Sequence, residues 1–208
     1  MSVAGPVRLA TILGGLALAV ALAVTARSMR PRAPLPVLGH VPSFRLIDEH
    51  GAPFTSETML GHVSVVDFVF TRCTSSCPRL TARMAELQQR LGRGGRGEGD
   101  VRLVSFSVDP ENDTPAVLAD YAAKAGAQAG RWTFVTGSVD DIERAVVLGF
   151  KVSAAKIAKG ATDYDVVHGE WLVLVDRAGD LRGYYPVGEE SEFQALVDDV
   201  ARVAHEKR

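Results

Sequence analysis

Apolar and polar residues along the chain alternate in two patterns, one typical of buried strands and one of helices. The segment 63–70 (VSVVDFVF) is a nearly continuous, mostly β-branched run, typical of a strand buried on both faces. Pro78 then opens a segment whose apolar residues recur at helical spacing, and proline is tolerated in a helix's first turn. These apolar residues are Leu80, Met84, Leu87 and Leu91. The pattern predicts a strand, a loop and a helix in that order.

The same alternation repeats toward the C-terminus. Further strands are predicted at residues 101–108, 133–135, 171–175 and 181–185, and helices at residues 114–125, 138–148 and 189–204. Asp113 or Thr114 is expected to cap the helix at 114–125, and a short strand and hairpin turn are expected around residues 44–51. Strands that alternate with helices and end in a hairpin indicate an α/β domain with a partly parallel central sheet.

A different pattern occupies the N-terminus. Residues 9–26 form an uncharged run of 18 apolar or small residues, which is about the minimum that spans a bilayer. We interpret residues 1–8 as an n-region, 9–26 as a transmembrane signal anchor or a cleaved signal peptide, 27–40 as a linker and 41–208 as the domain. Arg27, Arg30 and Arg32 follow the run, and the positive-inside rule alone would keep the domain cytoplasmic, so the sequence leaves the orientation open.

Composition narrows the classes of partner. The 208 residues are 47% hydrophobic and 23% charged, enough apolar material for one core, and the formal net charge is −2. Binding to nucleic acid would require a basic surface that neutralises phosphates. We therefore expect no nucleic-acid partner.

The chain contains two cysteines, Cys73 and Cys77, placed between the strand at 63–70 and the helix after Pro78. The unpaired N–H groups and positive dipole of a helix N-terminus stabilise a thiolate, which attacks disulfides and binds soft metals. The spacing of four residues is expected to place both sulfurs on one helix face. Arg72 beside them would favour the thiolate. A purely structural disulfide is the alternative, although so small a loop constrains the unfolded chain little.

Three segments together resemble the Sco/SenC copper chaperone family. They are residues 68–78 (FVFTRCTSSCP), 104–115 (VSFSVDPENDTP) and 163–168 (DYDVVH). The resemblance implies a thioredoxin-like fold and a single-pass anchor in the inner membrane, with the domain facing the periplasm. It also implies a copper ion, Cu(I) or Cu(II), bound by Cys73, Cys77 and His168.

The family's function implies delivery of copper to, or reduction of the copper-site cysteines of, a respiratory cytochrome oxidase. The expected partners are the oxidase copper-site subunit or another copper chaperone. Two thiolates suit Cu(I), and an added imidazole can also hold Cu(II). The leading alternative is a membrane-anchored thiol-disulfide oxidoreductase in which one of Cys73 and Cys77 attacks and the other resolves. A peroxidase with one essential cysteine is a third possibility.

The chain departs from the family's usual pattern near each proposed ligand. Arg72 precedes Cys73 where a histidine is common, Thr74 and Ser75 replace a Pro-Asp pair, and Val167 replaces an aspartate before the histidine. Groups around the ligands orient them and tune metal affinity. These changes favour thiol-disulfide chemistry.

Other candidates have simpler interpretations. Asp109 and Asp113 lie in a segment typical of turns and helix caps. The glycine-rich segment 92–97 fits GxGxxG, but it follows a helix and precedes a strand, the reverse of a dinucleotide site. The remaining histidines lie in the linker, a turn, a loop and the terminus without partners at metal-ligand spacing, and they are expected to be solvated: His40, His50, His62 and His205.

Overall fold

The computed structural model describes residues 33–92, 100–151 and 170–206. The apolar run 9–26, most of the glycine-rich segment and His168 lie outside these residues. No helix within the described ranges is long and apolar enough to cross a membrane. One compact unit, Leu35–Arg208, carries all the elements of the fold.

An eight-stranded mixed sheet forms the centre of this unit, in the order β1-β8-β7-β4-β5-β6-β2-β3. The strands are β1 (Gly39–His40), β2 (Arg45–Asp48), β3 (Pro53–Thr55), β4 (Val63–Val69), β5 (Val101–Ser107), β6 (Trp132–Thr136), β7 (Trp171–Val175) and β8 (Asp180–Pro186). β4, β5 and β6 run parallel, whereas β7 pairs antiparallel with both β4 and β8. The partly parallel sheet predicted from the sequence is confirmed.

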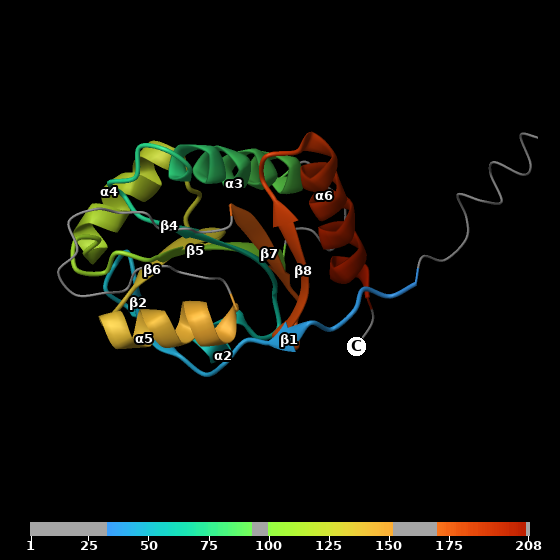
Figure 1. The fold of residues 1–208 in the computed structure, drawn as a ribbon, viewed down its shortest axis with the longest axis horizontal. Coiled ribbons are helices and arrows are strands. Elements are labelled where there is room, and N and C mark those ends of the chain that lie inside the picture. Colours follow the sequence, from blue (N-terminus) through green and yellow to red (C-terminus); the bar gives the residue numbers. More distant parts are fainter. Residues whose placement is uncertain (1–32, 93–99, 152–169, 207–208) are drawn as a thin grey trace, which may run out of the picture. The chain divides into compact units, whose positions relative to one another are not determined.

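Helices cover both faces of the sheet (Figure 1). α3 (Cys77–Gly92) and α4 (Pro115–Ala125) lie on one face, and α6 (Glu190–His205) packs beside α3. The other face carries the short α2 (Ser56–Met59) and α5 (Val139–Glu143), which continues as the π-helical turn η2 (Arg144–Gly149). Because strands feed helices on both faces, β4 and β5 are buried on both sides and lie in the centre of the core.

Two aromatic contacts pack the centre of the sheet on the α5 face. Phe68 of β4 and Phe106 of β5 both meet Phe150, with ring centroids 5.4 and 5.1 Å away in edge-to-face geometry. All three side chains are at most 2% exposed. Such pairs add to the burial of apolar area, so the C-terminal half of β4 is held firmly just before the cysteines.

Most predicted elements are confirmed, with differences at their ends. Thr114, rather than Asp113, caps α4, because its side chain accepts a hydrogen bond from the Val117 backbone. The end of the expected linker 27–40 joins the fold: β1 pairs with β8, and the Leu38 N–H donates to the Leu181 carbonyl at 2.8 Å. A two-residue strand next to an Arg/Pro-rich segment has too short a pattern to be recognised in the sequence.

Candidate metal centre

Cys73 and Cys77 lie at the junction between β4 and α3, where the sequence places them. The loop after Val69 turns so that the Cys73 N–H donates to the Phe70 carbonyl at 3.1 Å. α3 then begins at Cys77, whose backbone N–H donates to the Cys73 Sγ at 3.4 Å. Cys73 therefore precedes the helix and accepts from one of its free N–H groups. The expectation that both sulfurs share a helix face is wrong, because the helix does not reach back to Cys73.

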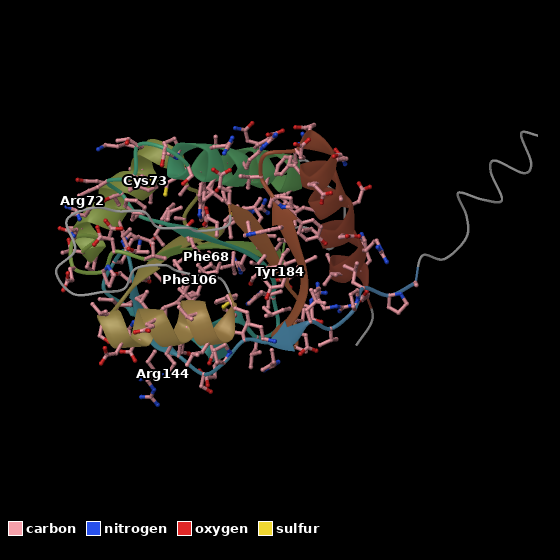
Figure 2. All side chains as sticks on the ribbon, in the orientation of Figure 1. Phe68, Arg72, Cys73, Phe106, Arg144 and Tyr184 are labelled. Atoms are coloured by element: carbon pink, nitrogen blue, oxygen red, sulfur yellow. The ribbon has the colours of Figure 1, made fainter. Side chains whose placement is uncertain are left out.

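The two thiols differ in exposure. Cys73 is partly exposed, Cys77 is fully buried, and neither takes part in a disulfide. Figure 2 shows Cys73 beside Arg72 at this edge of the molecule, whereas Phe68 and Phe106 lie inside. The Cys73 sulfur can thus contact a partner molecule, whereas the Cys77 sulfur is shielded from solvent.

Hydrogen bonds within the loop change the acidity of Cys73. Burial by itself would raise its pKa, but the Cys77 backbone N–H and thiol and Ser75 donate toward the sulfur and lower the pKa to about 6. The Ser75 Oγ lies 3.6 Å from the Cys73 Sγ. At neutral pH Cys73 is therefore mainly a thiolate, the form that attacks disulfides and binds soft metals.

Cys77 has the opposite character. Burial raises the pKa of its thiol, and the hydrogen bond to Cys73 and the negative charge of Cys73 raise it further. Cys77 is accordingly a thiol when Cys73 is a thiolate. The pair consists of one accessible nucleophile and one protected, protonated sulfur.

Arg72 is directed toward an acid on the neighbouring loop. Its Nη2 and Nε donate to the Asp109 Oδ2 at 2.8 and 3.3 Å, and the Asn112 amide donates to the Asp109 Oδ1 at 2.8 Å. Loop hydrogen bonds, rather than Arg72, are the larger influences on the pKa of Cys73. Asp109 therefore does more than form a turn. It ties the segment after β5 to residues 70–76, the loop between β4 and α3 that carries Cys73 (the cysteine loop).

The Asp113 side chain has a role beyond the turn that the sequence predicts. Its side chain is fully buried and accepts from the Thr71 and Ser107 hydroxyls at 2.6 Å each, and from the Thr71 N–H at 3.2 Å. Burial raises the pKa of Asp113, and these donors oppose the shift. The turn expected for Asp109 and Asp113 does form, since the Asp113 N–H donates to the Asp109 carbonyl at 2.9 Å, and Thr114 is the residue that caps the helix. The Asp113 side chain in addition holds the start of the loop that carries Cys73.

Asp67 is a further acid near the site, and no motif of the sequence points to it. It lies inside β4, is fully buried, and neither of its carboxylate oxygens has a hydrogen-bond partner among the described residues. Burial raises its pKa to about 7, an effect that Ser105 on β5 opposes, and its charge in turn raises the pKa of Cys77. An aspartate within a strand buried on both faces was the available signal.

The histidines are only partly as expected. His168 lies outside the described residues, and within those residues no group of three His, Cys, Asp or Glu side chains is placed to hold a metal. His40 and His62 do have partners: their Nδ1 atoms lie 3.0 Å from Asp180 and 2.7 Å from Asp100. Each acid is a single partner brought near by the folded chain; His40 is exposed as expected, whereas His62 is only partly exposed.

The donor set nonetheless suits a soft metal. Cys73 and Cys77 are unbridged, and the hydrogen bond between the Cys77 N–H and the Cys73 Sγ holds the two residues together. Thiolate sulfur selects Cu(I) over hard cations. The described residues thus provide two soft donors at the end of a central strand.

A thiol pair at the junction of a central strand and a helix of a mixed sheet defines a thioredoxin-like protein. Residues 36–205 match the model of the SCO1/SenC family, and the chain belongs to that family. A SCO1 protein homolog of Bacillus subtilis is 34% identical over 79% of this chain and 83% of its own length. A putative copper-binding protein of Stutzerimonas stutzeri is 32% identical over 69% of this chain and 68% of its own.

A solved structure shows the same fold. BsSco, a member of the Sco family of cytochrome c oxidase assembly proteins in which a disulfide switch was identified, is 32% identical, with a TM-score of 0.72. The alignment covers 85% of this chain and all of BsSco. The thioredoxin-like fold expected from the sequence is confirmed for the described residues.

Proposed function

We propose that the chain is a copper-binding Sco protein that acts in the assembly of a respiratory cytochrome oxidase. The observation that carries this proposal is the pair Cys73 and Cys77, two unbridged sulfurs joined by the hydrogen bond from the Cys77 N–H. Support comes from the family match and from the copper-binding relative. In this proposal Cys73, Cys77 and His168 hold the copper that the protein passes on.

Copper binding requires deprotonation of one of the two cysteines, Cys77. Cys73 is already a thiolate near pH 7, whereas Cys77 must lose its proton as the metal arrives. Loading is therefore expected to release about one proton per copper from the thiol pair at neutral pH. The Asp109–Arg72 and Asp113–Thr71 contacts keep the loop in place during this exchange.

The anchor and the compartment are part of the same proposal. The apolar run 9–26 would hold the protein in the inner membrane as a single-pass anchor, with the domain in the periplasm. Reaction of Cys73 with a membrane-impermeant maleimide on intact cells tests this orientation. Labelling before lysis supports it, and labelling only after lysis contradicts it.

The metal function is tested by anaerobic titration of the reduced full chain with Cu(I) against a competing chelator. One tightly held copper per chain is expected. His168→Ala should weaken binding, and the double variant Cys73→Ser, Cys77→Ser should abolish it. His205→Ala is the matched control, because His205 lies at the far end of α6 and is exposed. Equal copper binding by the wild type and the double variant would overturn the proposal.

A second function, thiol-disulfide exchange, is favoured by the asymmetry of the two cysteines. The Cys73 thiolate attacks a partner's disulfide and releases one partner thiolate, and Cys77 then attacks the mixed disulfide and releases the other. The chain ends oxidised, with a Cys73–Cys77 disulfide, and the partner ends reduced. A peptide carrying the two copper-site cysteines of an oxidase, supplied as its disulfide, tests this step. Reduction by the copper-free chain supports it, and no reduction by that chain contradicts it.

A further inference from the structure

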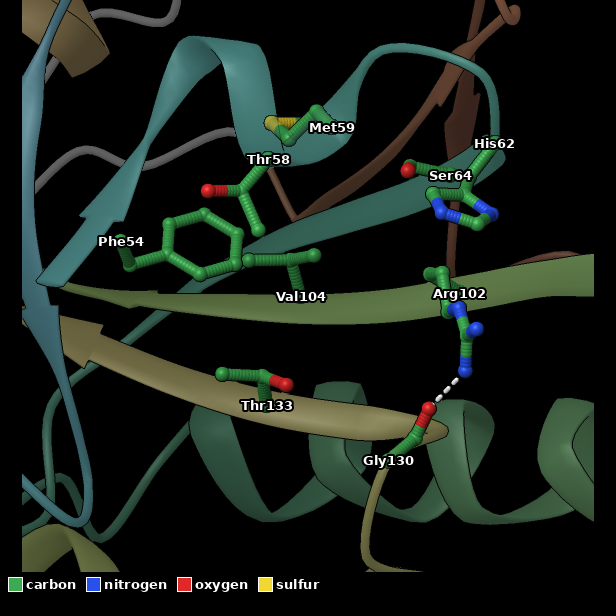
Figure 3. Close-up of a pocket in the computed structure, with 9 residues that line it drawn as sticks. All are labelled: Phe54, Thr58, Met59, His62, Ser64, Arg102, Val104, Gly130 and Thr133. Carbon is green, nitrogen blue, oxygen red and sulfur yellow. Dashed lines mark hydrogen bonds between the residues drawn. The ribbon is translucent and has the colours of Figure 1, made fainter. Parts of the chain in front are cut away.

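A hollow of about 310 Å³ lies over the N-terminal ends of β4, β5 and β6, at the other end of these strands from the cysteines (Figure 3). The aromatic cluster around Phe150 fills the same sheet face farther along. Among the described residues, the four-residue α2 is the helix over this end of the face, because the chain turns back into β4 at Val63. The hollow is thus a consequence of a short helix over a wide sheet.

The strand register gathers polar groups on the floor of this hollow. Ser64 of β4 pairs directly with Arg102 of β5, and Val104 pairs with Thr133 of β6, so all four side chains face the same side. Phe54 and Met59 form an apolar wall opposite them, as Figure 3 shows. The site has an apolar body with a polar floor, the arrangement common in small-molecule pockets.

Ser64 has no partner for its hydroxyl. The residue is 1% exposed, and its buried Oγ has no hydrogen-bond partner among the described residues. A buried hydroxyl left unpaired is unfavourable, because it loses its hydrogen bonds to water without gaining one in the protein. A ligand that accepts a hydrogen bond from this hydroxyl would remove that cost.

The charge lining the hollow is positive. Arg102 donates to the Gly130 carbonyl, which uses one of the five N–H donors of its guanidinium. His62 is also at the wall, with its Nδ1 atom on Asp100, and no acidic side chain of the described residues lines the hollow. Asp100 itself lies 3.9 Å from Arg177, which offsets its charge. The lining therefore favours an anion over a cation.

We propose that this hollow binds a small carboxylic acid with an apolar body. The carboxylate would accept from the Arg102 guanidinium and the Ser64 hydroxyl, and the body would pack against Phe54, Met59 and Val104. The volume lies at the lower end of the range for ligand pockets, which suits an acid with a single ring or a short chain. The site is separate from the cysteine pair and does not depend on the copper function.

The test uses 4-fluorobenzoate as the probe and the full chain in nonionic detergent micelles. Fluorine NMR line widths of 4-fluorobenzoate are compared with those of 4-fluorobenzyl alcohol, which has the same body without the charge. We expect the chain to broaden the benzoate signal more than empty micelles do, and unlabelled benzoate to reverse the effect. The alcohol should be broadened no more than in empty micelles.

Two variants locate the binding. Arg102→Gln removes the charge and should weaken benzoate binding at least about tenfold, the loss expected for a charge-assisted hydrogen bond. Thr133 is a half-buried residue near the start of β6, and Thr133→Phe would place a larger side chain in the hollow. This variant should abolish binding, and circular dichroism checks that it folds. Arg144→Gln is the matched control, since Arg144 lies on the surface beyond α5 (Figure 2), and it should bind as the wild type does.

Three outcomes would overturn the proposal. One is benzoate binding that is unchanged in Arg102→Gln, and another is equal broadening of the benzoate and the alcohol by the chain. The third is the absence of broadening beyond that of empty micelles. Because the readout involves no copper or thiol chemistry, its failure would leave the proposed copper function untouched.

Discussion

The Thr71 hydroxyl donates a 2.6 Å hydrogen bond to the Asp113 carboxylate, joining residues 42 positions apart in the chain. Asp113 also accepts from Ser107 at the end of β5. These hydrogen bonds attach the cysteine loop, at Thr71, to the segment before α4. The position of Cys73 thus depends on a buried acid outside the thiol pair.

Asp113→Ala should both destabilise the fold and raise the pKa of Cys73. The substitution leaves the Thr71 and Ser107 donors without a partner, at a cost of about 2–4 kcal/mol. A loosened loop also weakens the hydrogen bonds that keep Cys73 ionised. Urea unfolding and the pH profile of Cys73 alkylation measure the two effects. Asp120→Ala, an exposed position on α4, is the control, and equal effects of both variants would contradict this role.

The two cysteines should react very differently with iodoacetamide. Because the pKa of Cys73 is lowered to about 6 and that of Cys77 is raised, alkylation of the reduced native chain should occur at Cys73 with a midpoint near pH 6. Mass spectrometry of the labelled peptides assigns the site. Cys73→Ser should react only after unfolding. Comparable native labelling of both sulfurs would show that the asymmetry is absent.

Arg72→Ala is expected to change little in the isolated chain. Arg72 is half exposed and pairs with Asp109, and an ion pair with one exposed partner contributes on the order of 1 kcal/mol or less. The pKa of Cys73 should stay near 6, since loop hydrogen bonds have the larger influence on it. Arg72→Lys, which keeps the charge, is the comparison. A clear rise of the Cys73 pKa in the alanine variant alone would show that Arg72 acts on the thiolate.

Asp67 should make the fold less stable as pH rises through its titration range. Its pKa is raised from 3.8 to about 7 by burial, so the folded state holds a proton that the unfolded state releases. The stabilising contribution of the protonated form is complete below about pH 4 and is lost between about pH 4 and 7, up to about 4 kcal/mol. Asp67→Asn removes this titration, so its unfolding free energy should vary less over the same range. Parallel pH profiles for the variant and the wild type would contradict the assignment.

The sequence predicted the fold well because its strongest signals are local. The run at Val63–Val69 and the helical spacing from Leu80 to Leu91 each come from residues close in the chain, and both elements form where expected. The two-residue β1 was not predicted, since its pairing with β8 depends on residues about 140 positions away. Local pattern cannot report such a pairing.

The site was predicted at its cysteines but not around them. The position of Cys73 and Cys77 between a strand and a helix could be predicted, because a buried-strand pattern precedes them and Pro78 opens a helical pattern after them. The roles of Asp109 and Asp113 could not, because their partners Arg72 and Thr71 lie about 40 residues earlier in the chain. Asp67 could have been suspected as a charged residue in a doubly buried strand.

X-ray absorption at the copper K-edge of the Cu(I)-loaded full chain tests directly whether Cys73, Cys77 and His168 bind copper. We expect two sulfur scatterers, from Cys73 and Cys77, and one nitrogen scatterer that His168→Ala removes while the sulfurs remain. Oxidising the pair to a disulfide beforehand should prevent loading, since the metal and the disulfide use the same sulfurs. A first shell without sulfur, or one unchanged when both cysteines are replaced by serine, would show that Cys73 and Cys77 are not the copper ligands.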